Sequence, residues 1–141
     1  MVICGPPTLV SGSTDTVTSA ARLVEILSEL GYQGTWTSLY RSFAYGSYIK
    51  YATATNAKAW LSFSGRSIAW VATKSATSGR AWIYVDGSYV QTVDLYSTTT
   101  YGKRVAFSKS WPTSGTHSLQ VVVEGTSGRP AVDVDAFVVL R

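Results

Sequence analysis

One stretch of the chain decides the fold, and it reads Ala81-Trp82-Ile83-Tyr84-Val85-Asp86-Gly87-Ser88-Tyr89-Val90-Gln91-Thr92-Val93-Asp94-Leu95. Up to residue 85, small and aliphatic residues alternate with aromatic ones, which is the period of a strand with two different faces. Asp86-Gly87 then predicts a tight hairpin turn, because glycine tolerates the positive φ that such a turn requires. We therefore expect residues 89–95 to return as the antiparallel partner strand.

Outward from this hairpin, the chain repeats the same kind of pattern. Short β-rich runs are separated by Thr-Ser-Gly turns at residues 77–79, 113–115 and 126–128. The expected strands are residues 57–64, 68–72, 104–108, 118–124 and 131–140. We expect Val105 and Phe107 to share one face, and Trp70 to lie in the core. Strands at this spacing predict an all-β antiparallel sandwich or barrel over residues 35–141.

The N-terminal region has a different pattern. Residues 1–13 are rich in Pro, Gly and Ser and predict an extended arm or linker. Residues 14–31 predict one amphipathic helix, with Thr14 or Asp15 as its N-cap and Gly31 at its end. The apolar positions of this helix could pack on the sandwich, on another domain or on neighbouring subunits.

Composition excludes several classes of protein. The net charge is +4 and the pI is about 9.3, but the lysines and arginines are scattered singly, whereas a nucleic-acid partner requires a contiguous basic surface. Cys4 is the only cysteine, so the chain has no intrachain disulfide and no thiolate metal cluster. No apolar run is long enough to span a membrane, and the first residues lack the pattern of a signal peptide.

The titratable residues argue against an enzyme. His117 is the only histidine, and we expect it to be structural, since neither a zinc tetrad nor a second histidine base can be assembled around it. Asp133 and Asp135 lie two apart on one expected strand and so on one face, where they could hold a calcium ion if loop carbonyls complete its shell. The alternative is that they hydrogen-bond neighbouring loops or pair with Arg129. No other cofactor is expected.

The aromatic residues are the best candidates for binding. Sugars rest their C–H faces on Trp and Tyr rings while their hydroxyls seek polar partners. Strand alternation places some of these rings outside, opposite buried neighbours, and the candidates for ligand binding are Trp82, Tyr84, Trp60, Arg80, Trp36 and Tyr40. The alternative is that these rings cover a sheet edge or form a protein interface.

A family resemblance rests on several motifs of the second half. They are Ser64-Gly65-Arg66-Ser67-Ile68-Ala69-Trp70-Val71, Gly79-Arg80-Ala81-Trp82, Gly115-Thr116-His117-Ser118-Leu119 and Gly128-Arg129-Pro130 with Val132-Asp133-Val134-Asp135-Ala136-Phe137. Residues 57–141 resemble the galactose-binding-like jelly rolls of bacterial secreted proteins, which include many carbohydrate-binding modules. The resemblance implies an antiparallel jelly-roll sandwich without catalytic machinery, and it names no ligand.

Two functions follow from these observations. The first is a non-catalytic, carbohydrate-binding-like module that recognises a glycan or polysaccharide outside the cell or at its surface. The second is a structural protein of a virion, a tail or a surface layer, in which the arm and the helix contact identical subunits or a larger host protein. The absence of a visible signal peptide favours the second.

Overall fold

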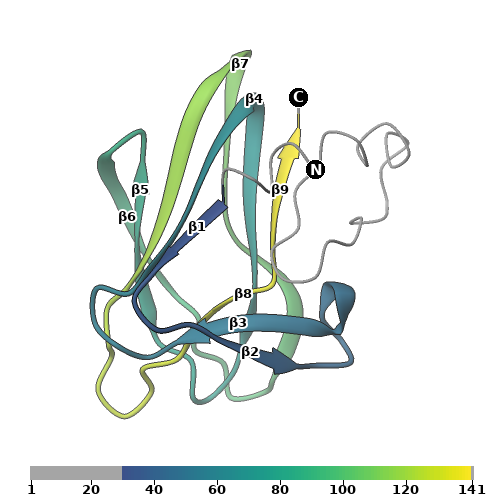
Figure 1. Ribbon diagram of the computed structural model, residues 1–141. Helices are drawn as coiled ribbons and strands as arrows, with labels where there is room; N and C mark the ends of the chain where they lie inside the picture. Colours follow the sequence, from purple (N-terminus) through teal and green to yellow (C-terminus); the bar gives the residue numbers. More distant parts are fainter. Residues whose placement is uncertain (1–29, 141) are drawn as a thin grey trace.

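The computed structural model describes residues 30–140, most of them in antiparallel strands (Figure 1). The elements are β1 (Leu30–Gln33), β2 (Thr37–Tyr40), the 3-10 turn η1 (Tyr45–Ser47), β3 (Tyr48–Ala52), β4 (Lys58–Lys74), β5 (Arg80–Val85), β6 (Ser88–Asp94), β7 (Tyr101–Val123), β8 (Val132–Val134) and β9 (Ala136–Leu140). The predicted all-β antiparallel sandwich is confirmed, whereas its jelly-roll topology stays a prediction.

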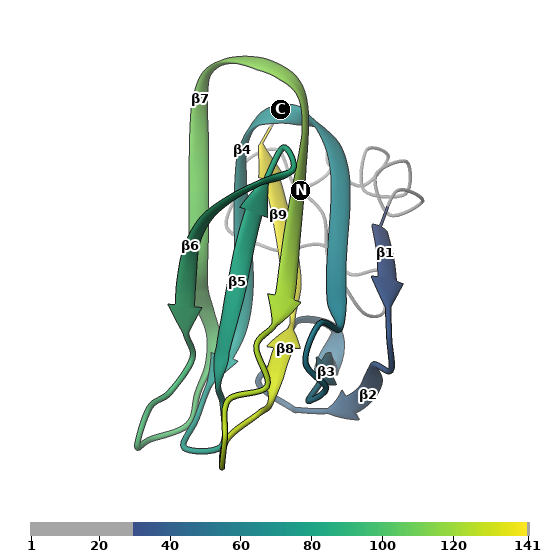
Figure 2. The same cartoon turned by 90° about the vertical axis from the view of Figure 1, so that its left-hand side faces the viewer.

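Two long strands build both layers of the sandwich. β4 and β7 each run up one layer, bend over the top and run down the other (Figure 2). Residues 58–65 pair with residues 115–122 in a layer ordered β1-β4-β7-β5-β6. Residues 67–74 pair with residues 101–110, and β9 extends that second layer on the other side of β4. A smaller sheet, ordered β2-β3-β8, lies at one end of the sandwich.

The bend in β4 has a visible cause in the sequence. The pairing with β7 shifts between Gly65 and Ser67, so the inward positions change from Leu61 and Phe63 before the bend to Ile68 after it. A Cβ at Gly65 would lie 2.8 Å from the carbonyl oxygen of Leu140, so glycine allows β9 to approach closely. One continuous strand can therefore contribute apolar side chains to both sides of the same core.

The core between the layers is formed by the buried side chains of both long strands and their neighbours. Trp70 has no exposed surface, as predicted, and its indole N–H donates to the Asp133 carbonyl oxygen over 3.2 Å. Burial of such a side chain supplies the main driving force for folding, and its single polar atom is satisfied. The largest fully buried side chains are Trp70, Phe63, Phe137, Leu61, Ile68, Ile83, Leu95, Leu119 and Val121.

The predicted hairpin is confirmed. Val85 pairs with Ser88, and the two residues between them, Asp86 and Gly87, have φ values of 50° and 83°. Positive φ at both central positions defines the turn whose twist matches that of the flanking strands. The turn places β5 and β6 at one edge of the five-stranded layer.

Some predicted boundaries were wrong. The expected strands 57–64 and 68–72 are two halves of β4, and 104–108 and 118–124 belong to β7. Phe107 is buried, but Val105 is 61% exposed rather than on the same face. The register explains this difference, because Trp70 pairs with Phe107 and the next residue, Val71, pairs with Val105. The extra residue of β7 forms a bulge that reverses the alternation.

The predicted arm at 1–13 and the helix at 14–31 lie outside the described residues, except at the end of the helix. Leu30 and Gly31 are part of β1 and pair with Leu61 and Trp60 of β4. The sheet therefore includes residues 30–33, which precede the predicted start of the sandwich at residue 35, and Gly31 is a strand residue rather than the end of a helix. Among the residues described, none forms a helix that could cross a membrane.

Candidate functional site

The outer surface of the five-stranded layer carries aligned rows of aromatic and polar side chains. In the first row, Gln33 pairs with Lys58, Lys58 with Val122, and Val122 with Trp82. Lys58 and Trp82 alternate with buried neighbours, so the row faces away from the core, although Val122 within the row is only 7% exposed. It forms the first half of what we call the aromatic face, defined by the two rows.

The second row lies two residues further along each strand. Here Gly31 pairs with Trp60, Trp60 with Gln120, and Gln120 with Tyr84, which pairs in turn with Tyr89. Trp60 is 38% exposed and Tyr89 54% exposed. The aromatic face therefore presents rings from three strands, β4, β5 and β6, on one surface.

Gly31 and Trp60 are matched to each other. A Cβ at residue 31 would collide with the indole ring of Trp60, mainly with its Cζ2 and Cε2 atoms. The ring therefore lies over the β1 backbone in space that only glycine leaves free. Trp60 is partly exposed, so packing in the core does not determine the position of its ring. The contact with Gly31 does.

A shallow cleft of about 430 Å³ crosses the aromatic face. Trp82 and Tyr84 of β5 line it together with Lys58 and with the side-chain amides of Gln33, Asn56 and Gln120. Amides both donate and accept hydrogen bonds, and a lysine donates them. The cleft thus combines apolar ring surface with neutral and cationic hydrogen-bonding groups, and it is lined by none of the acidic residues.

The aromatic face continues onto the edge strand β6. The rings of Tyr84 and Tyr89 meet edge to face, with centroids 5.8 Å apart, and the Tyr89 hydroxyl is hydrogen-bonded to Thr92 over 2.8 Å. Such pairs favour one ring orientation over others. Tyr89 is therefore held as an extension of the face rather than as an isolated surface ring.

Arg80 is the first residue of β5, two residues before Trp82, and it forms an ion pair with an acidic partner. Its Nε donates to Glu124 over 2.8 Å, and its backbone N–H donates to Thr126 Oγ1 over 2.9 Å. Across the hairpin, Arg129 donates to both carboxylate oxygens of Asp94, over 2.6 and 3.0 Å. Arg80 thus borders the aromatic face within a network of ion pairs.

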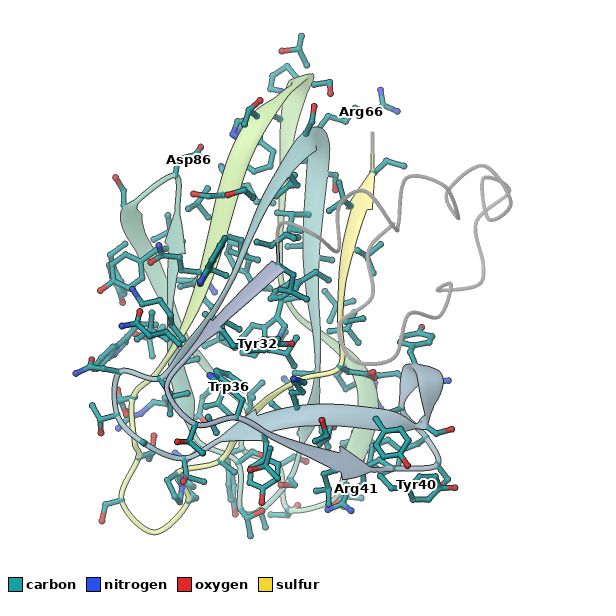
Figure 3. The ribbon with its side chains drawn as sticks, in the orientation of Figure 1. Tyr32, Trp36, Tyr40, Arg41, Arg66 and Asp86 are labelled. Atoms are coloured by element: carbon teal, nitrogen blue, oxygen red, sulfur yellow. The ribbon has the colours of Figure 1, made fainter. Side chains whose placement is uncertain are left out.

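Two of the predicted binding residues lie elsewhere. Trp36 is partly buried between β1 and β2, packs against Tyr32 at 5.3 Å between ring centroids, and donates its indole N–H to the Gln33 carbonyl. Tyr40 ends β2 and is 57% exposed. Figure 3 shows Tyr40 beside Arg41 and apart from Tyr32 and Trp36. The structure thus places Trp60, Trp82 and Tyr84 on one surface, but of the predicted rings only Trp82 and Tyr84 line the cleft, and Trp60, Trp36 and Tyr40 do not.

Asp133 and Asp135 both hold backbone groups. Asp133 in β8 accepts the Thr73 N–H with both carboxylate oxygens, each at 3.0 Å, whereas Asp135, between β8 and β9, accepts the Tyr45 N–H over 3.0 Å. Burial raises the pKa of each carboxyl group to about 7. These contacts match the predicted alternative of hydrogen bonds to neighbouring segments, although Arg129 is not a partner of either.

Calcium binding by this pair stays a prediction. Calcium takes six to eight oxygen ligands, and the described residues contain no group of three or more His, Cys, Asp or Glu side chains suited to a metal. Asp135 also interrupts the expected strand, so the pair does not sit on one uninterrupted strand face. The positions of the two carboxylates are explained by the backbone N–H groups that they bind.

His117 has structural contacts. Its ring stacks on Trp111, with centroids 3.7 Å apart and planes 10° apart, and its Nδ1 is 2.9 Å from Asp86 Oδ2. The other oxygen of Asp86 accepts the Ser118 N–H over 2.9 Å. This cluster ties the β5–β6 hairpin to β7, as the expectation of a structural histidine implies.

Sequence reasoning missed several residues of the aromatic face and its cleft, namely Gln33, Asn56, Lys58, Gln120 and Tyr89. For two of them the signal was present. Lys58 and Gln120 alternate with residues that were expected to be buried, so they had to share the outer surface with Trp60. Gln33 had no such signal, because it lies between the helix that was predicted to end at residue 31 and the sandwich that was predicted to begin at residue 35.

The fold is that of the β-sandwich carbohydrate-binding modules. A family 35 carbohydrate-binding module from Clostridium thermocellum superimposes with a TM-score of 0.52 at 14% identity, over 81% of this chain and 93% of that module. A Paenibacillus xanthan lyase gives a TM-score of 0.57 at 17% identity, over 78% of this chain and 12% of the lyase.

Sequence comparison adds one relative. A type blood alpha-D-galactosamine galactosaminidase from Flavonifractor plautii is 27% identical over 108 residues, which is 77% of this chain. The chain spans only about 10% of the length of that enzyme. No family model matches the sequence.

Proposed function

We propose that this chain is a non-catalytic carbohydrate-binding module that holds a glycan on its aromatic face. The observation that carries the proposal is the alignment of Trp60 on β4 with Trp82 and Tyr84 on β5, in two adjacent rows of one surface that β7 connects. Rings placed in this way offer flat apolar surface for the C–H faces of sugars, and Gln120 between them offers hydrogen bonds to hydroxyl groups.

The dimensions of the face favour an extended ligand. Trp60 and Tyr84 lie on strands separated by one intervening strand, which corresponds to about 10 Å at the usual strand spacing. The cleft is shallow and open along its length rather than a closed pocket. An internal stretch of a polysaccharide fits such a surface better than a single small molecule.

The acidic residues support binding without catalysis. Glycoside hydrolysis requires two carboxyl groups that flank one bond. The described carboxylates are engaged with His117, Arg129, Arg80 and the N–H groups of Thr73 and Tyr45, and none of them lines the cleft. A similar sandwich occurs in a solved xanthan lyase as a small part of a longer chain, which suits a module that attaches a larger protein to polysaccharide.

Affinity electrophoresis tests this function. The protein is run through native gels that contain a panel of soluble polysaccharides, and at least one of them should retard it. Trp82→Ala and Tyr84→Ala should each weaken the retardation by about tenfold, equivalent to about 1.4 kcal/mol. Tyr101→Ala is the matched control, because Tyr101 is 43% exposed but lies outside the cleft.

Light scattering on the same samples distinguishes a protein interface. A monomer that loses polysaccharide retention in the two β5 variants supports the glycan site. A defined oligomer that dissociates in the same variants, with no polysaccharide retained, would show that the face joins subunits instead.

A further inference from the structure

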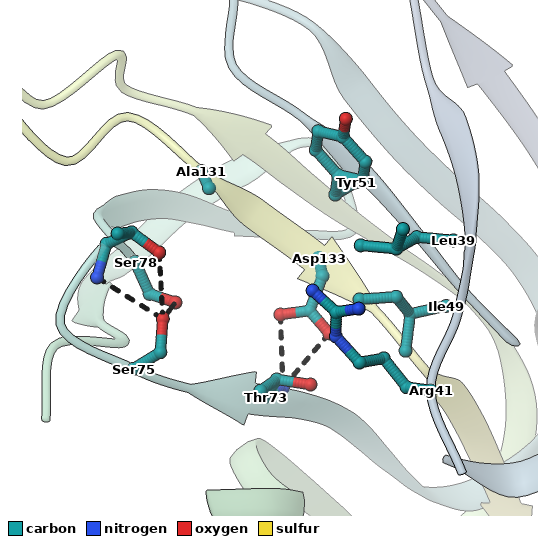
Figure 4. Close-up of a pocket in the computed structure, with 10 residues that line it drawn as sticks. Leu39, Arg41, Ile49, Tyr51, Thr73, Ser75, Ser78, Ala131 and Asp133 are labelled. Atoms are coloured by element: carbon teal, nitrogen blue, oxygen red, sulfur yellow. Dashed lines mark hydrogen bonds between the residues drawn. The ribbon is translucent and has the colours of Figure 1, made fainter. Parts of the chain in front are cut away.

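A second pocket lies between the small β2-β3-β8 sheet and the loop after β4. Its volume is about 270 Å³, and it is lined by residues that include Leu39, Arg41, Ile49, Thr73, Ser78 and Asp133 (Figure 4). None of these residues lines the cleft of the aromatic face. The pocket and the cleft therefore share no lining residue.

The pocket contains a fixed carboxyl group. Asp133 is only 4% exposed, and both of its oxygens accept the Thr73 N–H at 3.0 Å, which sets the orientation of the group. One shared N–H leaves most of the accepting capacity of the two oxygens unused. The carboxyl group is therefore preorganised to bind a further hydroxyl.

The hydroxyl of Thr73 is the second polar group. Thr73 is 7% exposed, and its Oγ1 is fully buried beside the Asp133 carboxyl, which is its one possible partner among the described residues, but no well-formed hydrogen bond joins the two. A buried hydroxyl without a partner costs free energy, and native structures leave few of them. A ligand hydroxyl bound at this point would satisfy Thr73 and Asp133 together.

Charge and shape define the class of ligand. Arg41 supplies a guanidinium that donates one hydrogen bond to the Tyr40 carbonyl over 3.1 Å and keeps its other N–H groups. Asp133 is an anion only above its raised pKa of about 7, where its charge is opposite to that of Arg41, so neither an anion nor a cation is favoured by both. Leu39 and Ile49 supply apolar wall. A neutral ring with hydroxyls and a C–H face matches the Asp133 carboxyl, the Thr73 hydroxyl, the Arg41 guanidinium and the apolar wall.

We propose that this pocket is a second binding site, which accepts a single neutral sugar residue such as the end or a branch of a glycan. Its volume is just below the range of about 300–1,000 Å³ typical of small-molecule sites, which limits the ligand to one ring. The proposal shares its class of ligand with the proposed function but uses different residues, so either can fail without the other.

Nuclear magnetic resonance of the 15N-labelled chain tests the pocket with defined probes. Glucose, galactose, mannose, xylose and N-acetylgalactosamine are titrated separately. At least one should shift the amide signals of Thr73 and Ser78. Thr73→Val keeps the shape but removes the hydroxyl, and it should weaken this binding by about tenfold. Thr116→Val, an exposed residue of β7, is the matched control and should bind as the wild type does.

Two further variants keep the outcome unambiguous. Arg41→Gln changes an exposed residue, and it should also weaken the sugar-induced shifts. Trp82→Ala, which disables the aromatic face, should leave them unchanged. The proposal is overturned if no sugar of the panel shifts the Thr73 and Ser78 signals, or if Thr73→Val and Arg41→Gln bind the sugar as tightly as the wild type.

Discussion

The indole of Trp60 occupies the space that a side chain at residue 31 would need. Gly31 and Trp60 are direct cross-strand partners in β1 and β4, so the missing side chain on one strand determines where the ring on the other lies. This pairing links the first described strand to the aromatic face. It gives a glycine near the start of the sandwich a role in positioning a proposed binding residue.

Gly31→Ala should therefore weaken glycan retention while leaving the fold intact. The added Cβ would displace an exposed ring rather than disturb the core, so we expect a change in tryptophan fluorescence and a loss of binding similar to that of Trp60→Ala. Gly115→Ala is the matched control, because the nearest atom to its Cβ, His117 Nε2, is 3.4 Å away. Wild-type retention in Gly31→Ala would contradict this role.

Asp86→Ala should destabilise the domain by about 1–3 kcal/mol, measured by urea denaturation. Asp86 has a φ of 50°, accepts the Ser118 N–H over 2.9 Å and contacts His117. Alanine loses these bonds and tolerates positive φ poorly. Asp86→Asn is the control, since asparagine accepts such a φ and keeps one accepting oxygen, and it should lose less stability than alanine. Equal losses in the two variants would argue against this explanation.

The ion pair between Asp94 and Arg129 should give a specific dependence on pH. The two hydrogen bonds from Arg129, helped by the Tyr96 N–H, lower the pKa of Asp94. Its folded pKa lies below the unfolded value of about 3.9, so the stabilisation is present above that pH and is lost as the pH falls through the folded pKa.

Thermal unfolding from pH 7 to pH 2 checks this expectation. Asp94→Asn should have a lower Tm than the wild type at neutral pH, and the difference should close below about pH 4. In the Arg129→Gln background, Asp94→Asn should have a smaller effect, because the partner is already absent. A difference that persists unchanged at low pH would mean that ionisation of Asp94 is not its source.

The predictions from local pattern were accurate where one strand or one turn was sufficient. The alternation around Ile83 and the Asp86-Gly87 step predicted both the strand and its turn, because side-chain period and positive φ are local properties. The same alternation placed Trp60, Trp82 and Tyr84 outside. Those residues form the part of the proposed binding site that could be found without the structure.

Other features depend on contacts between distant segments. Val105 turned outward because of a bulge in its pairing with β4, and Asp133 and Asp135 bound the N–H groups of Thr73 and Tyr45, which lie at least 60 residues away. Gly31 looked like the end of a helix and proved to be a strand residue beneath Trp60. In each case the position of the residue depends on a contact with a segment far away in the sequence, which no local sequence pattern identifies.

By itself, then, the sequence determined that this protein is an antiparallel β-sandwich with rings on an outer surface, since strand period, turn chemistry and apolar alternation are encoded by neighbours along the chain. Only the tertiary structure decided which rings share one surface and which polar groups line the second pocket. Register and strand order bring residues together across the sheets, and these are fixed by the packing of the whole core.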